Sequence, residues 1–189
     1  MQEISLNILD IVQNSVRAGA SRIDVELFED TDSDELFFSV KDNGCGMDEE
    51  MVARVMDPFV TTRTTRKVGM GISLLRSAAQ ATGGDVELTS EVGKGTFIKA
   101  TFSYGHIDRQ PLGDMAGTMM TLISMNEAID FYYKHTFNRQ VFEFNTKEMK
   151  EILGEVPLGD PTVAAWLKDF IDEGIANIYG NGNIIGGAE

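Results

Sequence analysis

Hydrophobic positions in the first half of the chain follow two periods, one typical of helices and one typical of strands. Residues 4–18 carry isoleucine, leucine and valine largely at helical spacing, and Gly19 follows where a helix commonly ends. Residues 22–27 and 36–41 instead alternate apolar and polar side chains, with the acidic turn 29–35 between them. This alternation predicts a half-buried hairpin that directly follows the first helix.

Further helices and a second hairpin are predicted up to residue 105. The elements are a short helix at 49–56, a polar and basic loop at 60–68, a helix at 71–82, and strands at 86–89 and 96–102. Asp48 is a suitable N-cap for the short helix, and Gly83 and Gly84 end the longer one. The pattern predicts an α+β fold, a two-layer α/β sandwich with a mixed sheet and helices on one face.

A glycine- and proline-containing stretch with few apolar residues, 106–117, predicts a linker after a first domain of residues 1–105. Residues 118–179 then form a small C-terminal α+β region. Its predicted elements are strands at 118–124, 128–135 and 140–144, a short helix at 147–153, and an amphipathic helix at 161–178. The tail, 180–189, is rich in glycine and asparagine, and we expect it to be flexible.

Charge and composition narrow the classes of function. The 189 residues carry a net charge of -14, which disfavours partners with anionic phosphates, so we expect neither nucleic acid nor a membrane surface as a partner. No apolar run approaches the roughly 20 residues of a membrane span. The first residues show no basic-then-apolar signal pattern, and the single cysteine excludes an internal disulfide. A cytoplasmic protein is therefore expected.

Polar side chains of the first helix are the first candidate site. Asp10 and Asn14 are four residues apart, so they lie one turn apart on the same side of the helix. Mg²⁺ takes few protein ligands beside substrate phosphates, and the Asn14 carboxamide oxygen is one that it accepts. Asp10 could orient or deprotonate an attacking water, or hold a metal-bound water, and Arg17 could reach a phosphate. The alternative is a polar face that simply meets solvent.

The segment that follows the second strand suggests recognition of a base. A buried carboxylate at a strand end, Asp42, can accept a hydrogen bond from an exocyclic amine such as adenine N6, whereas guanine presents an oxygen there. Gly44 and Gly46 would let the backbone wrap the base. The alternative is an ordinary tight turn, for which aspartate, asparagine and glycine are common residues.

Two glycine-containing segments suggest phosphate binding and a contact beside the base. Gly69 and Gly71 precede a helix, where backbone N–H groups and the helix dipole favour an anion. Arg63 and Lys67 lie just upstream and could neutralise a triphosphate, although the Gly-Lys-Ser/Thr ending of a Walker loop is missing. Thr96, in the turn before a strand, could bond the base edge or a water beside Asp42. A glycine hinge and a plain hairpin turn are the alternatives.

Taken in order, these segments resemble the GHKL ATPase superfamily. The resemblance covers about residues 4–103, with boxes at 10–14, 42–46, 57–59, 69–71 and 93–96. Residues 14–24 are similar to the mismatch-repair branch, whereas 58–63, 69–74 and 83–97 are similar to the histidine-kinase branch. The resemblance implies a Bergerat-type fold that binds ATP and Mg²⁺.

Residue roles follow from the resemblance. It implies that Asn14 binds the metal, Asp42 binds adenine, Phe59 packs under the lid, and Gly69 and Gly71 meet the phosphates. Asp10 takes the catalytic position. The remaining nucleotide-binding residues that it implies are Arg17, Gly44, Gly46, Met47, Arg63, Lys67, Met70 and Thr96.

Departures from the family pattern shape the expected function. Hydrolytic members carry glutamate at the place of Asp10. We also expect that the phosphoacceptor hairpin of histidine kinases, which would precede the first helix, is missing. His106 lacks the acceptor motif, and His135 lies in a strand-like stretch. We therefore expect a Mg-ATP-binding protein that phosphorylates or regulates a separate partner protein, as histidine kinases or the related anti-sigma serine kinases do. The alternative is a non-kinase conformational switch or slow ATPase. A homodimer is compatible with either.

Overall fold

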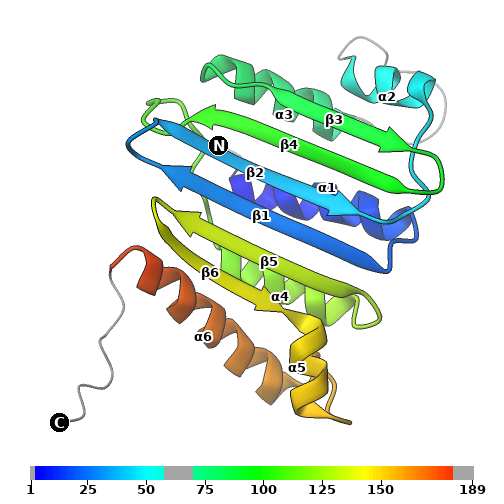
Figure 1. Cartoon of the computed structure of the whole chain (residues 1–189), viewed down its shortest axis with the longest axis vertical. Coiled ribbons are helices and arrows are strands. Elements are labelled where there is room, and N and C mark those ends of the chain that lie inside the picture. The colour runs from blue at the N-terminus through cyan, green and yellow to red at the C-terminus, as the bar shows by residue number, and fades with distance from the viewer. Residues whose placement is uncertain (1–2, 58–69, 181–189) are drawn as a thin grey trace.

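A six-stranded sheet organises the described part of the chain in the computed structural model, which covers residues 3–57 and 70–180 (Figure 1). The strands run in the order β3-β4-β2-β1-β5-β6. Neighbouring strands are antiparallel except β1 and β5, which are parallel. The strands are β1 (Arg22–Asp30), β2 (Glu35–Asp42), β3 (Val86–Glu91), β4 (Gly95–Ser103), β5 (Asp130–Phe137) and β6 (Gln140–Asn145).

Helices form a second layer against one face of this sheet (Figure 1). They are α1 (Ile4–Arg17), α2 (Glu49–Met56), α3 (Met70–Ala81), α4 (Met115–Met125), α5 (Thr146–Leu153) and α6 (Pro161–Ile178). Helix α1 contacts α3 on one side and α4 on the other, and α4 contacts α6. The two-layer α+β sandwich predicted from the sequence is therefore confirmed. Among the described helices, none is both long and apolar enough to cross a lipid bilayer.

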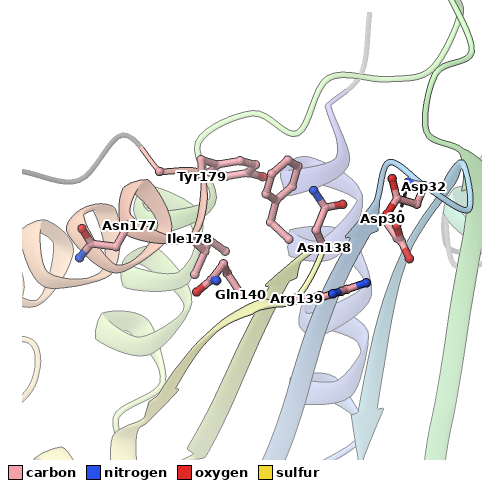
Figure 2. Close-up of a pocket in the computed structure, with 10 residues that line it drawn as sticks. Asp30, Asp32, Asn138, Arg139, Gln140, Asn177, Ile178 and Tyr179 are labelled. Atoms are coloured by element: carbon pink, nitrogen blue, oxygen red, sulfur yellow. Dashed lines mark hydrogen bonds between the residues drawn. The ribbon is translucent and has the colours of Figure 1, made fainter.

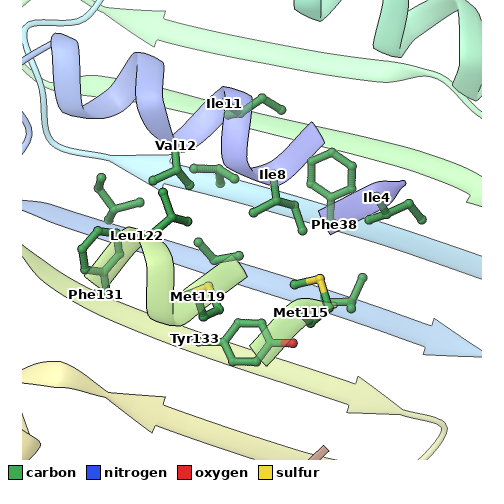
Figure 3. Close-up of a cluster of buried hydrophobic side chains, with 14 of the residues drawn as sticks. Ile4, Ile8, Ile11, Val12, Phe38, Met115, Met119, Leu122, Phe131 and Tyr133 are labelled. Atoms are coloured by element: carbon green, nitrogen blue, oxygen red, sulfur yellow. The ribbon is translucent and has the colours of Figure 1, made fainter. Parts of the chain in front are cut away.

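The core lies between the two layers and follows directly from the strand alternation. In β1, Ile23, Val25 and Leu27 are buried, whereas the residues between them lie on the other face. Figure 3 shows Ile8 and Val12 of α1 beside side chains of α4 and of the sheet. Burial of this apolar area is the main favourable term in folding. It fixes α1, which carries the first candidate site, against the sheet.

Helix N-termini begin where capping residues occur in the sequence. The Asp48 carboxylate accepts a hydrogen bond from the Met51 N–H at 2.8 Å, which confirms the predicted cap and the short helix. Asp160 accepts from the Thr162 N–H at 2.9 Å, and Pro161 occupies the first turn of α6. The predicted bounds of that amphipathic helix, 161–178, are also confirmed.

The strand predicted at 118–124 is wrong, because these residues belong to α4. The run is apolar almost throughout, so its periodicity does not distinguish a buried strand from a buried helix. Helix α4 packs against both α1 and α6, and its Met119 and Leu122 side chains are buried. A helix covered on several sides is apolar on several sides. Its N-cap, Asp114, accepts from the Gly117 N–H at 2.7 Å and is the missed start signal.

The C-terminal elements continue the sheet and the core of the first half. Strand β5 pairs with β1, and α4 packs on α1. Of the residues expected to form a linker, 106–117, residues 106–114 belong to the connection from β4 to α4, which runs along the start of α1, whereas 115–117 are already the first turn of α4. There, the Ile4 and Ser5 N–H groups donate to the carbonyls of Pro111 and Leu112, both at 2.9 Å. This connection thus supplies hydrogen-bond acceptors for two N–H groups at the start of α1, which have no partner within the helix.

A buried polar cluster attaches the end of α6 to the sheet. The Glu29 carboxylate contacts His135 Nε2 at 2.9 Å, and His135 Nδ1 contacts the Tyr133 hydroxyl at 3.0 Å. The Tyr179 hydroxyl donates to the same carboxylate. Burial, together with Glu29, raises the pKa of both tyrosines, so their hydroxyls remain protonated donors. The cluster therefore holds the residue that follows α6 in a fixed place.

Candidate nucleotide site

A pocket of about 300 Å³ opens between the sheet and helices α1, α2 and α3. Seven residues proposed from the sequence line it. These are Asn14, Arg17, Asp42, Gly46, Met47, Gly71 and Thr96. They come from four separate segments of the chain, so the fold brings together residues that the sequence spaces over more than 80 positions. Its volume is at the lower end of the range for small-molecule sites.

The Asp42 carboxylate is a buried part of the lining of this pocket. Asp42 is the last residue of β2 and is 8% exposed, as predicted for a buried carboxylate at a strand end. One oxygen, Oδ1, accepts from the N–H groups of Gly44 at 2.9 Å and Thr96 at 3.2 Å. The other, Oδ2, accepts from the Ser15 hydroxyl at 2.6 Å. These donors fix the carboxylate plane before any ligand arrives.

The Asp42 carboxylate can accept one more hydrogen bond. Two carboxylate oxygens offer about four lone-pair sites, and three donors from the described residues occupy Asp42. A further donor from the pocket side, such as an exocyclic amine, therefore fits. The surrounding wall is apolar and would suit the faces of a flat heterocycle. Its apolar members are Ile11, Val40, Met51, Val55, Ile72, Leu88 and Ile98.

Ser15 was missed by the sequence reasoning although its hydroxyl makes the shortest of these contacts. A signal was present. Ser15 continues the buried stripe of α1, seven residues after Ile8 and four after Ile11, and is itself 4% exposed. A polar residue on an apolar stripe needs a buried partner. Here that partner is Asp42, 27 positions away in the sequence.

On the solvent side of the pocket, α1 presents a row of exposed polar side chains. Asn14 and Arg17 line the pocket, and the Arg17 guanidinium donates to Asn14 Oδ1 at 3.1 Å. Asp10 is also exposed, one turn earlier, and is absent from the pocket lining among the described residues. A lone neutral oxygen such as Asn14 Oδ1 fits a Mg²⁺ ion that keeps its other ligands as water and phosphate. Within the described ranges, no cluster of three or more carboxylate, histidine or cysteine side chains could hold a metal.

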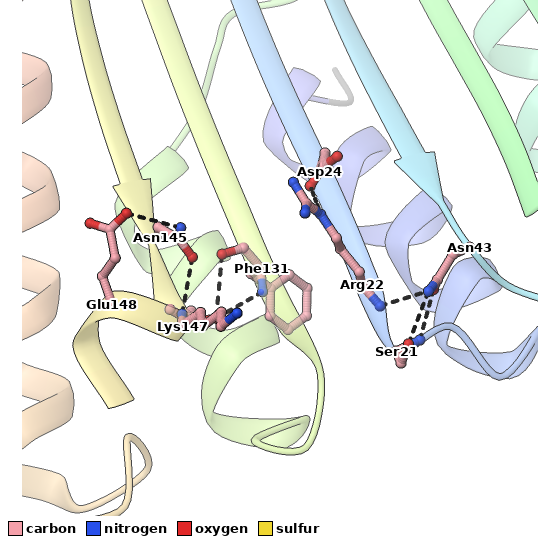
Figure 4. A network of polar contacts seen from close by, with 9 residues as sticks. Ser21, Arg22, Asp24, Asn43, Phe131, Asn145, Lys147 and Glu148 are labelled. Carbon is pink, nitrogen blue, oxygen red and sulfur yellow. Dashed lines mark hydrogen bonds and ion pairs between the residues drawn. The ribbon is translucent and has the colours of Figure 1, made fainter. Parts of the chain in front are cut away.

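The loop after β2 is held by its own side chains and by close packing. Asn43 Oδ1 accepts from the N–H groups of Ser21 and Arg22, both at 2.9 Å, which ties the loop to the start of β1 (Figure 4). Gly44 packs on Ala18, and Gly46 has a φ of +67°. A Cβ at Gly46 would lie 2.0 Å from the Glu91 carbonyl oxygen. Both glycines are therefore needed for contacts between backbone segments.

Several residues proposed from the sequence lie outside the part of the chain that the structure describes. Phe59, Arg63, Lys67 and Gly69, and the predicted loop at 60–68, fall outside the described residues. Met70 is the first residue of α3, and only its helical backbone is described. The phosphate-binding half of the proposed site therefore stays a prediction.

A second, larger hollow of about 580 Å³ lies at the opposite end of the sheet (Figure 2). It is lined by the β5–β6 turn, by the end of β1 and by the residues that follow α6, including Arg139, Asp30 and Tyr179. The register pairs Ile23 with Asp42 and Asp30 with Glu35, so the two cavities are separated by the length of β1. The residues proposed for nucleotide binding line the smaller cavity, which we take as the candidate site.

The chain is similar to parts of known histidine kinases. The chain is 34% identical over 98 residues to the signal transduction histidine-protein kinase AtoS of Escherichia coli K12, covering 51% of this chain and 15% of that protein. It is 34% identical over 111 residues to the sensor histidine kinase WalK of Bacillus subtilis 168, covering 54% of this chain and 18% of that protein. The chain thus spans less than a fifth of the length of these relatives.

Among solved structures, the Aquifex aeolicus MutL ATPase domain complexed with ADP aligns with a TM-score of 0.47 at 14% identity. The alignment covers 96% of this chain and 70% of that one.

The fold and the motif residues define an ATPase domain of the GHKL class. More particularly, the model of the family described as histidine kinase-, DNA gyrase B-, and HSP90-like ATPase matches residues 2–106, more than half of the 189 residues, so the chain belongs to that family.

Proposed function

We propose that the chain binds Mg-ATP in this pocket and transfers the γ-phosphoryl group to a separate partner protein. The observation that carries the proposal is the Asp42 carboxylate, which is buried in the pocket lining and held by Ser15, Gly44 and Thr96. A carboxylate fixed in this way selects a base with an amine over a base with a carbonyl oxygen at the same place. The carbonyl oxygen, like the carboxylate, only accepts hydrogen bonds, so both oxygens would be left without a donor. Adenine is therefore favoured over guanine.

Asn14 and Arg17 would face the phosphate end. Asn14 would supply a ligand to Mg²⁺, and the bound ion would neutralise charge on the phosphates. Arg17 now donates to Asn14 Oδ1, and in the nucleotide complex its guanidinium would turn to a phosphate oxygen. Asp42 and Asn14 thus define the two ends of the bound nucleotide.

Transfer to a protein acceptor is favoured over hydrolysis by the residue type at position 10. Hydrolysis needs a base that holds a water close to the γ-phosphate, and Asp10 is one methylene shorter than the glutamate of hydrolytic members. In phosphoryl transfer, positioning and charge neutralisation supply most of the rate enhancement. The bond between the γ-phosphorus and the bridging oxygen breaks, a bond to a histidine nitrogen or serine oxygen of the acceptor forms, the acceptor loses its proton, and ADP leaves.

The second candidate is an ATP-dependent conformational switch, and helix α2 favours it. Met51 and Val55 of α2 line the pocket, yet none of the residues of this helix is buried. A lightly packed helix of this kind has a small free-energy cost of moving. Nucleotide contacts with Met51 would shift its position and so change the surface that a partner meets.

Calorimetry on four proteins tests the nucleotide site. Asp42→Asn should weaken ATP binding about 10–100-fold and reduce the preference for ATP over GTP, since it disturbs a hydrogen bond to a charged group worth about 1.5–3 kcal/mol. Asn14→Ala should remove the effect of Mg²⁺ on affinity. Asp108→Asn, the same change at an exposed residue outside the pocket, is the control. Unchanged ATP affinity in both site variants would refute the site.

Labelling separates the kinase from the switch. The wild-type protein, added to a cell lysate with γ-labelled ATP, should transfer label to a protein band that Asn14→Ala fails to label. If ATP binds but no band appears, the kinase proposal fails. A protease-cleavage pattern around α2 that changes with Mg-ATP would then support the switch, and an unchanged pattern would exclude it.

A further inference from the structure

Strand β6 is the last strand on its side of the described sheet, and it lacks the usual protection of an edge. Its sequence, Gln140–Asn145, contains two phenylalanines and a valine, with no proline and no lysine. Natural edge strands are commonly blunted by such residues or by bulges, because free N–H and C=O groups template pairing with another chain. Within the described residues, β6 pairs only with β5.

An aromatic row reaches this edge from α6. Trp166 and Phe170 stack with ring centroids 5.8 Å apart, and they are 53% and 39% exposed. Phe170 continues the row to Phe142 and Phe144 of β6, at centroid distances of 5.9 and 6.3 Å. Gly174 allows this approach, because a Cβ there would lie 2.1 Å from the Phe142 ring. Exposed clusters of this kind, tryptophan above all, mark contact sites for partners.

The two faces of β6 differ in chemistry. Phe142 and Phe144 face α6, and Glu143 between them faces the opposite side of the sheet, where it accepts a hydrogen bond from Tyr132. Glu143 is exposed, and so are Asp169 and Glu173 on α6. The one lysine of α6, Lys168, is paired with Asp172 at 2.5 Å. The β6 edge therefore combines an apolar face, toward α6, with exposed carboxylates on β6 and on α6.

A second copy of this chain would be a poor occupant. Each copy carries a net charge of -14 and would bring the same acidic α6 to the contact, so like charges would meet around the pairing strands. A segment of opposite charge avoids this repulsion. An added strand would place alternate side chains on the two faces, apolar ones against Phe170 and Trp166 and cationic ones beside Glu143.

We propose that the β6 edge docks an extended segment of a partner protein in which basic and apolar residues alternate. The segment adds a seventh strand to the described sheet through main-chain hydrogen bonds. Strands β1 and β5 separate β6 from β2 and β4, which line the nucleotide pocket. The docking surface is therefore spatially separate from the nucleotide pocket, and its test can be made without ATP.

Trp166 is the only tryptophan of the chain, so its fluorescence reports on this surface directly. An eight-residue peptide that alternates lysine and valine should shift the Trp166 emission to shorter wavelength in a saturable way. A matched peptide that alternates glutamate and valine should not. A third peptide, the lysine–valine sequence N-methylated at every residue, keeps the charge and the apolar side chains but has no main-chain N–H donor on either edge, and it should bind much more weakly.

Charge reversal tests the role of Glu143. Glu143→Lys should weaken binding of the lysine–valine peptide about fivefold, in line with the modest energies of exposed cross-strand pairs, and should allow the glutamate–valine peptide to bind. Glu87→Lys, the same change on β3 at the other edge of the described sheet, should alter neither affinity.

Three outcomes would overturn the inference. They are equal binding of both charged peptides, no emission change with any peptide, and a Trp166 emission shift that follows protein concentration together with a doubled mass in light scattering. The last outcome would assign the edge to a second copy.

Discussion

The Ser15 hydroxyl is the most informative single group to remove from the nucleotide pocket. Its Oγ lies 2.6 Å from Asp42 Oδ2 and 3.5 Å from the Ile11 carbonyl, so the carboxylate is its principal partner. Ser15→Ala leaves Oδ2 buried without its protein donor, while Gly44 and Thr96 still hold Oδ1. A hydrogen bond to a charged group contributes about 1.5–3 kcal/mol, and an unpaired buried acceptor costs a similar amount.

The expected loss is therefore about 1.5–3 kcal/mol in the free energy of unfolding. For a chain of this size it corresponds to a fall in Tm of about 3–12 °C. ATP affinity should also fall, by about tenfold, because a carboxylate held through Oδ1 alone is less well oriented to accept from the amine. Thermal unfolding followed by circular dichroism, together with calorimetric titration, measures both quantities.

Ser77→Ala is the matched control. The Ser77 hydroxyl donates to the carbonyl of Ser73 in its own helix at 3.0 Å and lies on the exposed side of α3. Its removal should change stability by less than about 0.5 kcal/mol. If Ser15→Ala unfolds at the same temperature as Ser77→Ala and binds ATP as the wild type does, then Ser15 does not hold the carboxylate and the proposed geometry of the base site is wrong.

Two other changes follow from the same structure. Gly46→Ala should destabilise the protein by more than about 3 kcal/mol, since a Cβ would lie 2.0 Å from the Glu91 carbonyl oxygen; an ordinary urea midpoint would contradict this packing. Asp85 accepts a hydrogen bond from Arg76 at 2.9 Å, which holds the pKa of that carboxyl below its usual range. Its stabilisation, below about 1 kcal/mol for an exposed pair, is present above the unfolded pKa and is lost as the pH falls through the folded pKa. Asp85→Asn should therefore be less stable than the wild type at pH 7, with the difference vanishing on acidification, and a constant difference would contradict the shift.

The first half of the fold could be predicted because its elements obey local rules. The strand at 22–27 alternates strictly, and Asp48 caps its helix through a contact within three residues. The helix over 118–124 could not be distinguished from a strand, since its apolar surface is set by α1 and α6, which surround it only in the folded molecule.

For the site, the motif residues that line the pocket were predictable from their chemistry and order. The partners that hold Asp42 were harder, because the contact with Ser15 spans 27 positions and depends on how α1 lies across β2. The catalytic position of Asp10 stays a prediction. Its carboxylate is exposed and does not line the pocket formed by the described residues, and the segment 58–69, which holds part of the proposed phosphate site, lies outside them.

Helix α1 connects the nucleotide pocket with the C-terminal elements. One side of α1 carries Asn14 and Ser15, and another side packs against α4. Asn7, buried near its start, donates to Gln110 Oε1 at 2.6 Å in the connection that leads to α4. A displacement of α1 on nucleotide binding would therefore change contacts with α4, and through α4 the packing of α6 beside the β6 edge. Close packing transmits such displacements because the core has little free volume. The proposed docking edge and the nucleotide pocket are separate sites, but they share a continuous path of packed helices along which each could bias the other.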